Sequence, residues 1–380
     1  MRNPVSITAI STISPLGQDP DEIWENYKAG KHFLTQRKIG NKEWITGNLS
    51  EALNIAVENL RSENSKYRYL DRSVLLAILA GRNLSLSTKN AGINIGSSRG
   101  ATELFEKYHK EFLNTGKTSS YSSPSTTLGN ISSWVAQDLQ LNGASFSHSM
   151  TCSTGMHSIL NGIAWLESGM SQNFIVGGSE APLTDFTLAQ MEAMKIYATN
   201  ASEFPCQALD MLKTKNTMVL AEASGLIQME LGISENCEAT IRGIGYGNEE
   251  LKHGASLSKN GECLQKSMKM AISEMDTREI DAVILHAPGT LGGDFSEVKA
   301  VKMVFGDKIP ALTSNKWLLG HSFAASGILS VEMAILMLKH QEFIKVPFSE
   351  FQKKPEKLEN ILVNSVGFGG NAVSVLISRN

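Results

Sequence analysis

The chain has 380 residues, which is enough for two domains or for one large core built from two similar halves. Hydrophobic residues make up 42% and charged residues 19%, so a folded globular protein is expected and a disordered one is excluded. The formal net charge of −3 argues against a dedicated nucleic-acid binder, and no nucleic-acid partner is expected.

The first residues, the longest apolar run and the cysteines together predict a cytoplasmic protein. The first residues, Met-Arg-Asn-Pro, lack the basic, apolar and small-residue plan of a signal peptide. The longest apolar run, residues 324–338, contains Ser326, Ser330 and Glu332, which predicts a buried helix and no membrane span. Cysteine occurs at positions 152, 206, 237 and 263. This spacing matches neither a disulfide framework nor a zinc site, so we expect a reducing cytoplasm and no metal.

The N-terminal part of the chain predicts alternating strands and helices. Residues 5–10 alternate like a strand, and a helix is expected from Asp19 onwards. The polar segment 34–72 is weakly patterned, and we expect it on the surface. Residues 91–96 predict a short buried strand that ends in a turn rich in glycine and serine. The Ser- and Thr-rich segment 118–130 predicts a long loop.

The most informative pattern is an approximate internal repeat. The first copy consists of a turn, an amphipathic helix and a buried strand, at residues 151–155, 159–166 and 173–178. The second copy has the same three parts at residues 320–322, 328–338 and 361–370. Duplication of an α/β unit would place the two turns on one rim of the molecule, where α/β proteins usually carry out chemistry.

Cys152 is the candidate nucleophile, because it lies among small residues where a strand turns into a helix. A thiol at a helix N-terminus faces unpaired backbone N–H groups and the positive end of the helix dipole, so its thiolate is expected to be favoured. A sharp turn also leaves N–H groups aimed at a developing oxyanion. The alternative is that Cys152 is a small buried apolar side chain.

Two of the eight histidines are candidate partners of this cysteine. His286 ends the apolar strand 281–285, and His321 lies between Gly320 and Ser322 at the start of a buried helix. Each imidazole is placed at the end of a buried element near glycine, where a ligand can approach. For either histidine alone, a structural role is the alternative. Of the other six, four lie in polar surroundings where exposure is expected, and His157 lies on a helix where packing is expected. His148 lies in the strand that leads to Cys152, and its side chain could point to either face.

Several motifs together resemble the β-ketoacyl-[acyl carrier protein] synthases. They are Thr151-Cys-Ser-Thr-Gly155, His286-Ala-Pro-Gly-Thr290 with Asp294 and Glu297, Lys316-Trp-Leu-Leu-Gly-His321, and Asn364-Ser-Val-Gly-Phe-Gly-Gly370. Their order and spacing extend the resemblance over essentially the whole chain. The resemblance implies an α/β thiolase fold, a duplicated five-layer αβαβα sandwich, with one half at residues 1–235 and the other at 236–380.

The resemblance also implies a catalytic role for each motif residue. Cys152 would carry the acyl group as a thioester, and the N–H groups of Cys152 and Phe368 would form the oxyanion hole. The Phe368 side chain would gate the acyl pocket. His286 and His321 would donate hydrogen bonds to the enolate formed when a malonyl thioester loses carbon dioxide. Lys316 would help to keep His321 neutral.

Further residues of these motifs are implied in support and in substrate binding. Glu297 would hold Lys316 in place, Thr290 would touch the pantetheine arm, and Gly369 and Gly370 would line the substrate site. No metal or cofactor is implied, because the substrates travel on the phosphopantetheine arm of an acyl carrier protein. A homodimer, or a heterodimer with a related ketosynthase-like subunit, is expected.

The sequence also departs from the family's pattern. Ala287 and Pro288 replace a pantetheine-binding hydroxyl, residues 213–216 diverge from the usual Arg-Asp-Gly stretch, and Asn371 follows Gly370. A dedicated polyketide or aryl-polyene synthase is therefore as well supported as a fatty-acid synthase. The alternative is a chain-length factor, the silent partner of a ketosynthase heterodimer. A degradative thiolase is disfavoured because it would need a second cysteine near the C-terminus.

Overall fold

The computed structural model describes residues 3–128, 130–199, 202–254 and 257–380. Its first sheet has five strands in the spatial order β1, β7, β6, β4 and β5. Their bounds, in that order, are Val5–Ile13, Ala223–Leu231, Asn173–Glu180, Ala91–Gly96 and Ser145–Phe146. The β1–β7 and β7–β6 pairs are antiparallel, whereas the β6–β4 and β4–β5 pairs are parallel.

The second sheet repeats this pattern with strands from the later part of the chain. Its spatial order is β8, β12, β11, β9 and β10. Their bounds, in that order, are Ala239–Asn248, Asn371–Ser378, Asn360–Gly367, Ala282–Ile284 and Ala311–Thr313. The first two pairs are again antiparallel and the last two parallel. Each strand therefore has a counterpart: β4 corresponds to β9, β5 to β10 and β6 to β11. The internal repeat predicted from the sequence is confirmed.

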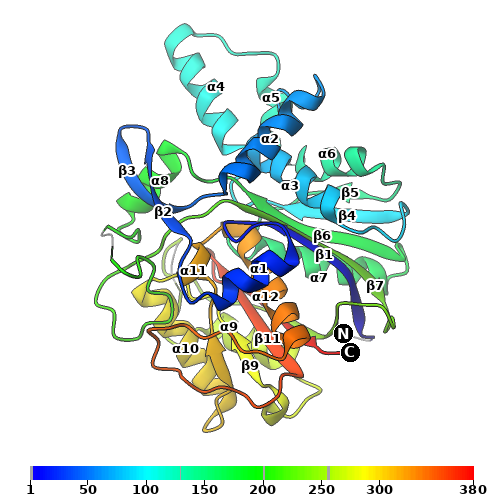
Figure 1. Ribbon diagram of the computed structural model, residues 1–380, viewed down its shortest axis with the longest axis vertical. Coiled ribbons are helices and arrows are strands. Elements are labelled where there is room, and N and C mark those ends of the chain that lie inside the picture. The colour runs from blue at the N-terminus through cyan, green and yellow to red at the C-terminus, as the bar shows by residue number, and fades with distance from the viewer. Residues whose placement is uncertain (1–2, 129, 200–201, 255–256) are drawn as a thin grey trace.

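Five layers alternate between helices and sheets (Figure 1). Helices α3 (Arg72–Asn83) and α6 (Asn130–Leu139) pack on the first sheet, and α9 (Glu262–Ala271) with α10 (Leu291–Phe305) covers the second. Between the sheets, α7 (Thr154–Glu167) and α12 (Ser326–His340) contact strands of both. The predicted αβαβα arrangement is confirmed. The first sheet uses residues 5–231 and the second 239–378, which supports our proposed division near residue 235.

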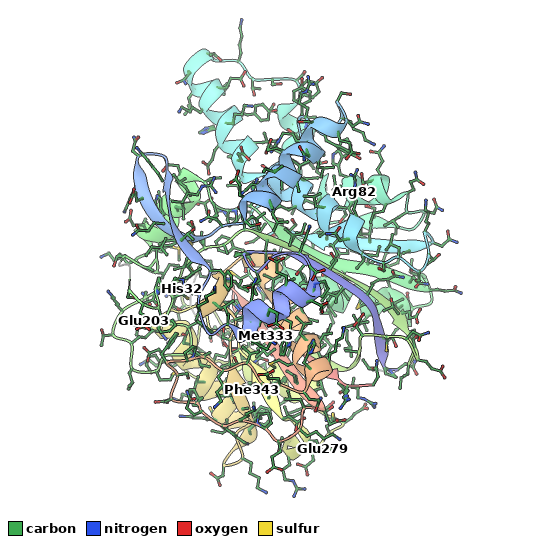
Figure 2. The ribbon with its side chains drawn as sticks, viewed as in Figure 1. His32, Arg82, Glu203, Glu279, Met333 and Phe343 are labelled. Carbon is green, nitrogen blue, oxygen red and sulfur yellow. The ribbon has the colours of Figure 1, made fainter. Side chains whose placement is uncertain are left out.

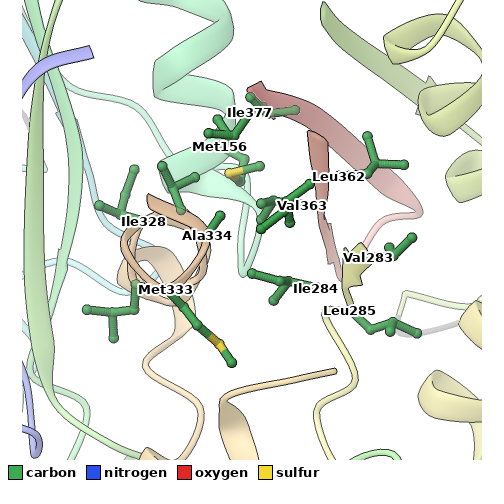
Figure 3. Packing of buried hydrophobic residues seen from close by; sticks show 14 of the residues in the cluster. Met156, Val283, Ile284, Leu285, Ile328, Met333, Ala334, Leu362, Val363 and Ile377 are labelled. Atoms are coloured by element: carbon green, nitrogen blue, oxygen red, sulfur yellow. The ribbon is translucent and has the colours of Figure 1, made fainter. Parts of the chain in front are cut away.

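Helix α12 is the centre of the hydrophobic core. Its residues from Ser326 to Leu338 are all buried, and Figure 3 shows Ile328 and Ala334 of this helix beside Met156 of α7. Figure 2 places Met333 at the middle of the molecule. The segment Phe323–His340 has the length and composition of a membrane-crossing helix, but 89% of it is buried inside the protein. The predicted buried helix is confirmed.

The remaining elements are short or lie at the edges of the layers. They are α1 (Pro20–Lys28), α2 (Glu51–Glu63), α4 (Thr102–Thr115), α5 (Ser122–Thr126), α8 (Asp185–Ala193), α11 (Lys316–Leu319), and the 3-10 turns Thr277–Glu279 and Phe323–Ala325. As predicted, α1 begins after Asp19, whose side chain accepts two N–H bonds of the first turn. The segment expected to be a loop, 118–130, contains α5; residue 129 lies outside the described residues.

Residues 34–72, expected to be a weakly patterned surface segment, form regular structure that is only partly exposed. It contains the hairpin β2 (Leu34–Ile39) and β3 (Lys42–Gly47), followed by α2. The buried part of the hairpin lies mostly in β3, where Trp44 and Ile45 are 6% and 8% exposed, while in β2 only Leu34 is buried. Most residues of β2 are exposed, which explains the weak hydrophobic pattern.

Candidate active site

Cys152 lies in a tight turn between β5 and α7. The preceding residue, Thr151, has a φ of 50°, a left-handed conformation that a β-branched residue rarely adopts. Helix α7 begins at Thr154, so the thiol lies at the amino end of a helix, as the sequence predicts. A Cβ at Gly367 would come within 2.0 Å of Thr151 Oγ1 and 3.1 Å of Cys152 N. Glycine at this position therefore lets the β11–β12 turn approach the nucleophile.

The two candidate histidines pack against each other. His286 follows β9, and His321 lies in the turn between α11 and α12. Their ring centroids are 5.1 Å apart, with the ring planes at 87°. Because β10 is the counterpart of β5, the turn with His321 occupies in the second half the place that the turn with Cys152 occupies in the first. The repeat thus brings both turns to one site, as the sequence analysis expects.

Each imidazole has one ring nitrogen without a protein partner. Nδ1 of His286 and Nδ1 of His321 are buried and accept or donate no hydrogen bond within the described part of the chain. A buried N–H without an acceptor is costly, so we infer that the proton of each neutral ring lies on Nε2. Burial, with the charge of Lys316 as a further cause, holds the pKa of both rings well below the usual range. Both rings are therefore neutral hydrogen-bond donors at physiological pH.

Glu297 fixes the backbone of the His286 turn. Its carboxylate accepts hydrogen bonds from the backbone N–H of His286 at 2.9 Å and of Ala287 at 2.8 Å. Asn364 Nδ2 donates a third bond at 3.2 Å. These bonds stabilise the φ of 22° at Ala287, which is strained for a residue with a side chain. The link from Glu297 to Lys316 is electrostatic, and no direct ion pair joins the two within the described residues.

Lys316 brings a buried positive charge to the same site. Its side chain is almost entirely buried, and burial lowers its pKa while the charge of Glu297 opposes that shift. Its charge contributes to the lowered pKa of both histidines and also lowers the pKa of the Cys152 thiol. Lys316 therefore acts electrostatically on each of the three candidate catalytic side chains.

The expectation of a favoured Cys152 thiolate is wrong for the resting protein. Burial raises the pKa of the Cys152 thiol to about 12, and the nearby charge of Glu180 contributes in the same direction. Lys316 and the backbone N–H groups of Cys152 and Phe368 lower it, but burial outweighs them. The same two N–H groups lie close enough to the sulfur to favour its negative charge, and their role as an oxyanion hole stays a prediction.

Glu180 is a buried carboxylate at the end of β6 that the sequence analysis did not single out. It accepts hydrogen bonds from Ser97 Oγ (2.7 Å) and from the backbone N–H groups of Ser98 (2.8 Å), Arg99 (3.1 Å) and Ala324 (3.2 Å). Burial raises its pKa to about 7. A charged residue immediately after a buried apolar strand is the sequence signal that would have found it.

A second acidic residue of α10 fastens the His286 turn. Asp294 accepts hydrogen bonds from the backbone N–H of Gly289 (3.0 Å) and Leu209 (2.9 Å). It also forms an ion pair with Lys213, with Nζ 2.7 Å from Oδ2 and both side chains fully buried. The segment around Lys213, which diverges from the family's pattern, thus supplies the positive charge that pairs with Asp294.

Two family models match the chain in succession. Residues 78–231 match the beta-ketoacyl synthase N-terminal domain, and residues 238–347 match the beta-ketoacyl synthase C-terminal domain. Together they cover more than half of the chain. The chain belongs to the β-ketoacyl synthase family. The recognition based on the cysteine, histidine, lysine and glycine motifs is confirmed.

Curated relatives of this synthase family extend over nearly its full length. The 3-oxoacyl-[acyl-carrier-protein] synthase 2 of Staphylococcus aureus (strain COL) is 27% identical, covering 98% of this chain and 97% of that protein. The 3-oxoacyl-[acyl-carrier-protein] synthase 1 of Haemophilus influenzae is 24% identical, covering 98% of each. At this identity the chain is a divergent member of the family.

Solved structures of ketosynthases share the fold. A chain of the ishigamide ketosynthase/chain length factor has a TM-score of 0.84 at 17% identity and covers all of both chains. A chain of a ketosynthase in complex with its chain length factor, from Xenorhabdus doucetiae, has a TM-score of 0.81 at 20% identity and covers 100% of this chain and 98% of that one. A beta-ketoacyl synthase from Burkholderia phymatum gives 0.82 at 20% identity over the full length of both.

The predicted substrate-binding residues lie in two turns, one after His286 and one between β11 and β12. Thr290 is the N-cap of α10, and its hydroxyl accepts the Gly293 N–H at 3.2 Å. Phe368 is 37% exposed in the turn between β11 and β12, followed by Gly369 and Gly370 at φ values of 95° and 65°. Their roles toward substrate stay predictions. The described part of the chain holds no group of three His, Cys, Asp or Glu side chains arranged for a metal ion.

Proposed function

We propose that this chain joins an acyl group, held as a thioester on Cys152, to a malonyl group with loss of carbon dioxide. The observation that carries the proposal is the meeting of one thiol, two neutral imidazoles and one buried lysine at equivalent turns of the two halves. The substrates would arrive on the phosphopantetheine arm of an acyl carrier protein, the carrier in the names of the curated relatives. The product would be a β-ketoacyl thioester.

In the first half-reaction, the Cys152 sulfur attacks the acyl carbonyl carbon. A C–S bond to the enzyme forms, the C–S bond to the carrier breaks, and the carrier sulfur leaves with the proton that the cysteine loses. Because burial raises the pKa of the Cys152 thiol, the resting thiol is protonated and must give up this proton in order to form the thioester. The N–H groups of Cys152 and Phe368 would hold the negative oxygen of the tetrahedral intermediate.

In the second half-reaction, the malonyl thioester loses carbon dioxide and its C–C bond electrons form an enolate. The Nε2–H groups of His286 and His321 would donate hydrogen bonds to the enolate oxygen, and removing one such donor typically slows a reaction on the order of 100-fold. The enolate carbon then attacks the acyl-cysteine, a new C–C bond forms, and Cys152 leaves as a thiolate that regains a proton. The Phe368 side chain would gate the acyl pocket.

A silent chain-length factor is the second candidate. Two structural relatives are complexes of a ketosynthase with such a factor, and Ala287 and Pro288 depart from the family's catalytic pattern. The retention of Cys152, His286 and His321 in one buried site favours the catalyst. Within that reading, a polyketide or aryl-polyene pathway is as well supported as fatty-acid synthesis, and a dimer with a second ketosynthase-like subunit is expected.

Intact-mass analysis with acyl carrier protein thioesters of several lengths tests the proposal. A stoichiometric acyl adduct on the unmodified protein, absent from Cys152→Ala, is expected. Cys206→Ala is the matched control, because Cys206 is also buried with a pKa raised to about 12 but lies outside the Cys152 turn. It should acylate normally. Absence of an adduct with every acyl group would favour the silent-partner reading.

A further inference from the structure

The turn after β4 carries a cation to the same rim as the nucleophile. Strand β4 is the counterpart of β9, so the turn at residues 97–100 holds in the first half the place that the His286 turn holds in the second. Strands β5, β4 and β6 are hydrogen-bonded neighbours and run parallel. Their carboxyl ends therefore bring Cys152, Arg99 and Glu180 to one edge of the sheet.

Hydrogen bonds fix this turn beside the segment that leads to Cys152. Ser97 N donates to His148 O at 3.3 Å, and Ser149 Oγ donates to Ser98 O at 3.3 Å. The Arg99 backbone N–H donates a hydrogen bond to Glu180, the carboxylate whose charge helps to raise the pKa of the Cys152 thiol. The backbone of Arg99 is thus held in place by the structure around the nucleophile.

The guanidinium of Arg99 has hydrogen-bonding capacity that the chain does not use. Nη2 donates to Gln190 Oε1 on α8, whereas Nε is buried without a partner. No carboxylate forms an ion pair with Arg99 in the described residues, although the buried Lys213 and the partly buried Arg72 each have one. A buried N–H donor without an acceptor destabilises the folded protein, and a bound ligand with an acceptor atom would remove that cost.

The neighbouring helix connects Arg99 with the apolar surroundings of the thiol. The residue after Gln190, Met191, belongs with Leu188 to a cluster of buried residues that also contains Cys152. An acyl chain leaving the sulfur would run along apolar side chains of α8 and meet the guanidinium beside them. Gln190, the partner of the guanidinium, therefore lies on the same helix as two apolar side chains that cluster with the thiol.

We propose that Arg99 binds a carboxylate at the far end of the acyl group on Cys152, so that the site selects acyl units derived from dicarboxylic acids. The inference rests on the proposed function and names its substrate class. A carboxylate would bridge Nε and a terminal nitrogen in the two-point geometry that guanidinium favours. A methyl-ended chain of the same length would leave Nε unsatisfied.

Competitive acylation with small thioesters tests this. The wild-type protein receives equal amounts of the N-acetylcysteamine thioesters of glutarate and pentanoate, which have the same carbon number, and adducts on Cys152 are counted by intact mass. A charge-assisted hydrogen bond of this kind gives a preference of roughly 10- to 100-fold for glutaryl. Arg99→Met should abolish the preference, and Arg99→Lys should retain part of it. Arg37→Met, on the exposed face of β2, is the charge-matched control and should leave it unchanged.

The outcomes separate this inference from the proposed function. If the wild type accepts pentanoyl at least as fast as glutaryl, Arg99 only braces α8 and the inference is wrong, while the adduct itself upholds Cys152 acylation. If neither thioester acylates the wild type, the proposed function fails and the inference with it. If Arg99→Met does not fold, the wild-type competition and Arg99→Lys still decide the question.

Discussion

Replacing Glu332 by glutamine is expected to stabilise the protein increasingly as pH rises. Glu332 lies in the central helix α12 and is 5% exposed. Its Oε1 accepts a hydrogen bond from Thr12 Oγ1 at 2.6 Å, while Oε2 is buried without a partner in the described chain. Burial raises the pKa of this carboxyl from 4.5 to about 7, and the Thr12 hydrogen bond opposes the shift.

The sign and size of the effect follow from this pKa difference. Between pH 4.5 and about 7 the unfolded chain releases a proton that the folded protein keeps, so the free energy of unfolding falls as pH rises. The slope is about 1.4 kcal/mol for each pH unit between the two pKa values. Ionisation of Glu332 therefore lowers the free energy of unfolding by about 3 kcal/mol at pH 8 and about 1 kcal/mol at pH 5. Glutamine cannot ionise and retains an acceptor for Thr12. Its unpaired amide N–H costs about 1 kcal/mol at any pH.

We therefore expect Glu332→Gln to match the wild type near pH 5 and to exceed it by about 2 kcal/mol near pH 8. Urea unfolding at the two pH values measures the difference. Glu342→Gln, an exposed glutamate just after α12, is the control and should give the same small change at both. An equal effect of Glu332→Gln at both pH values would refute the reasoning, because it would mean that Glu332 is ionised in the folded protein.

Three further predictions concern the active site. Lys213→Met leaves the buried Asp294 charge without its partner and should lower the free energy of unfolding by about 3–5 kcal/mol. Adding Asp294→Asn should recover part of this loss, and equal losses in the single and double variants would contradict the prediction. Alkylation of Cys152 by iodoacetamide, followed by peptide mass, should speed up about tenfold per pH unit from pH 7 to 10, and a pH-independent rate would be incompatible with a raised thiol pKa. At pH 7, where Lys316 keeps its charge because its pKa is lowered only to about 8, alkylation should be slower in Lys316→Met. His286→Ala should still acylate at Cys152 but condense about 100-fold more slowly, so a loss of acylation would show that His286 serves the first step instead.

Short-range patterns were sufficient to predict the internal repeat and the place of the nucleophile, whereas the five-layer fold was implied by the family resemblance. The turn of small residues at Cys152, the glycine-flanked His321 and the apolar run of α12 predicted two equivalent halves. The hairpin β2–β3 was not predicted because β2 has one buried residue, Leu34, so residues such as Trp44 do not form a continuous apolar pattern.

The electrostatics of the site could not be predicted from neighbouring residues along the chain. A helix N-terminus favours a thiolate, but Cys152 is covered by residues distant in sequence, and burial reverses the expected shift. The pairing of Lys213 with Asp294 joins positions 81 residues apart. The unsatisfied Arg99 Nε likewise depends on what α8 places beside it. Such effects arise from tertiary contacts and are visible only when the halves are assembled.

The most direct test of the account is the fate of a malonyl thioester offered to protein already acylated on Cys152. With malonyl carrier protein labelled in its free carboxyl carbon, we predict one labelled carbon dioxide for each β-ketoacyl product. The product should be absent with Cys152→Ala. Acylated wild-type protein that releases no carbon dioxide and makes no β-ketoacyl product would contradict the catalytic reading and favour a silent partner.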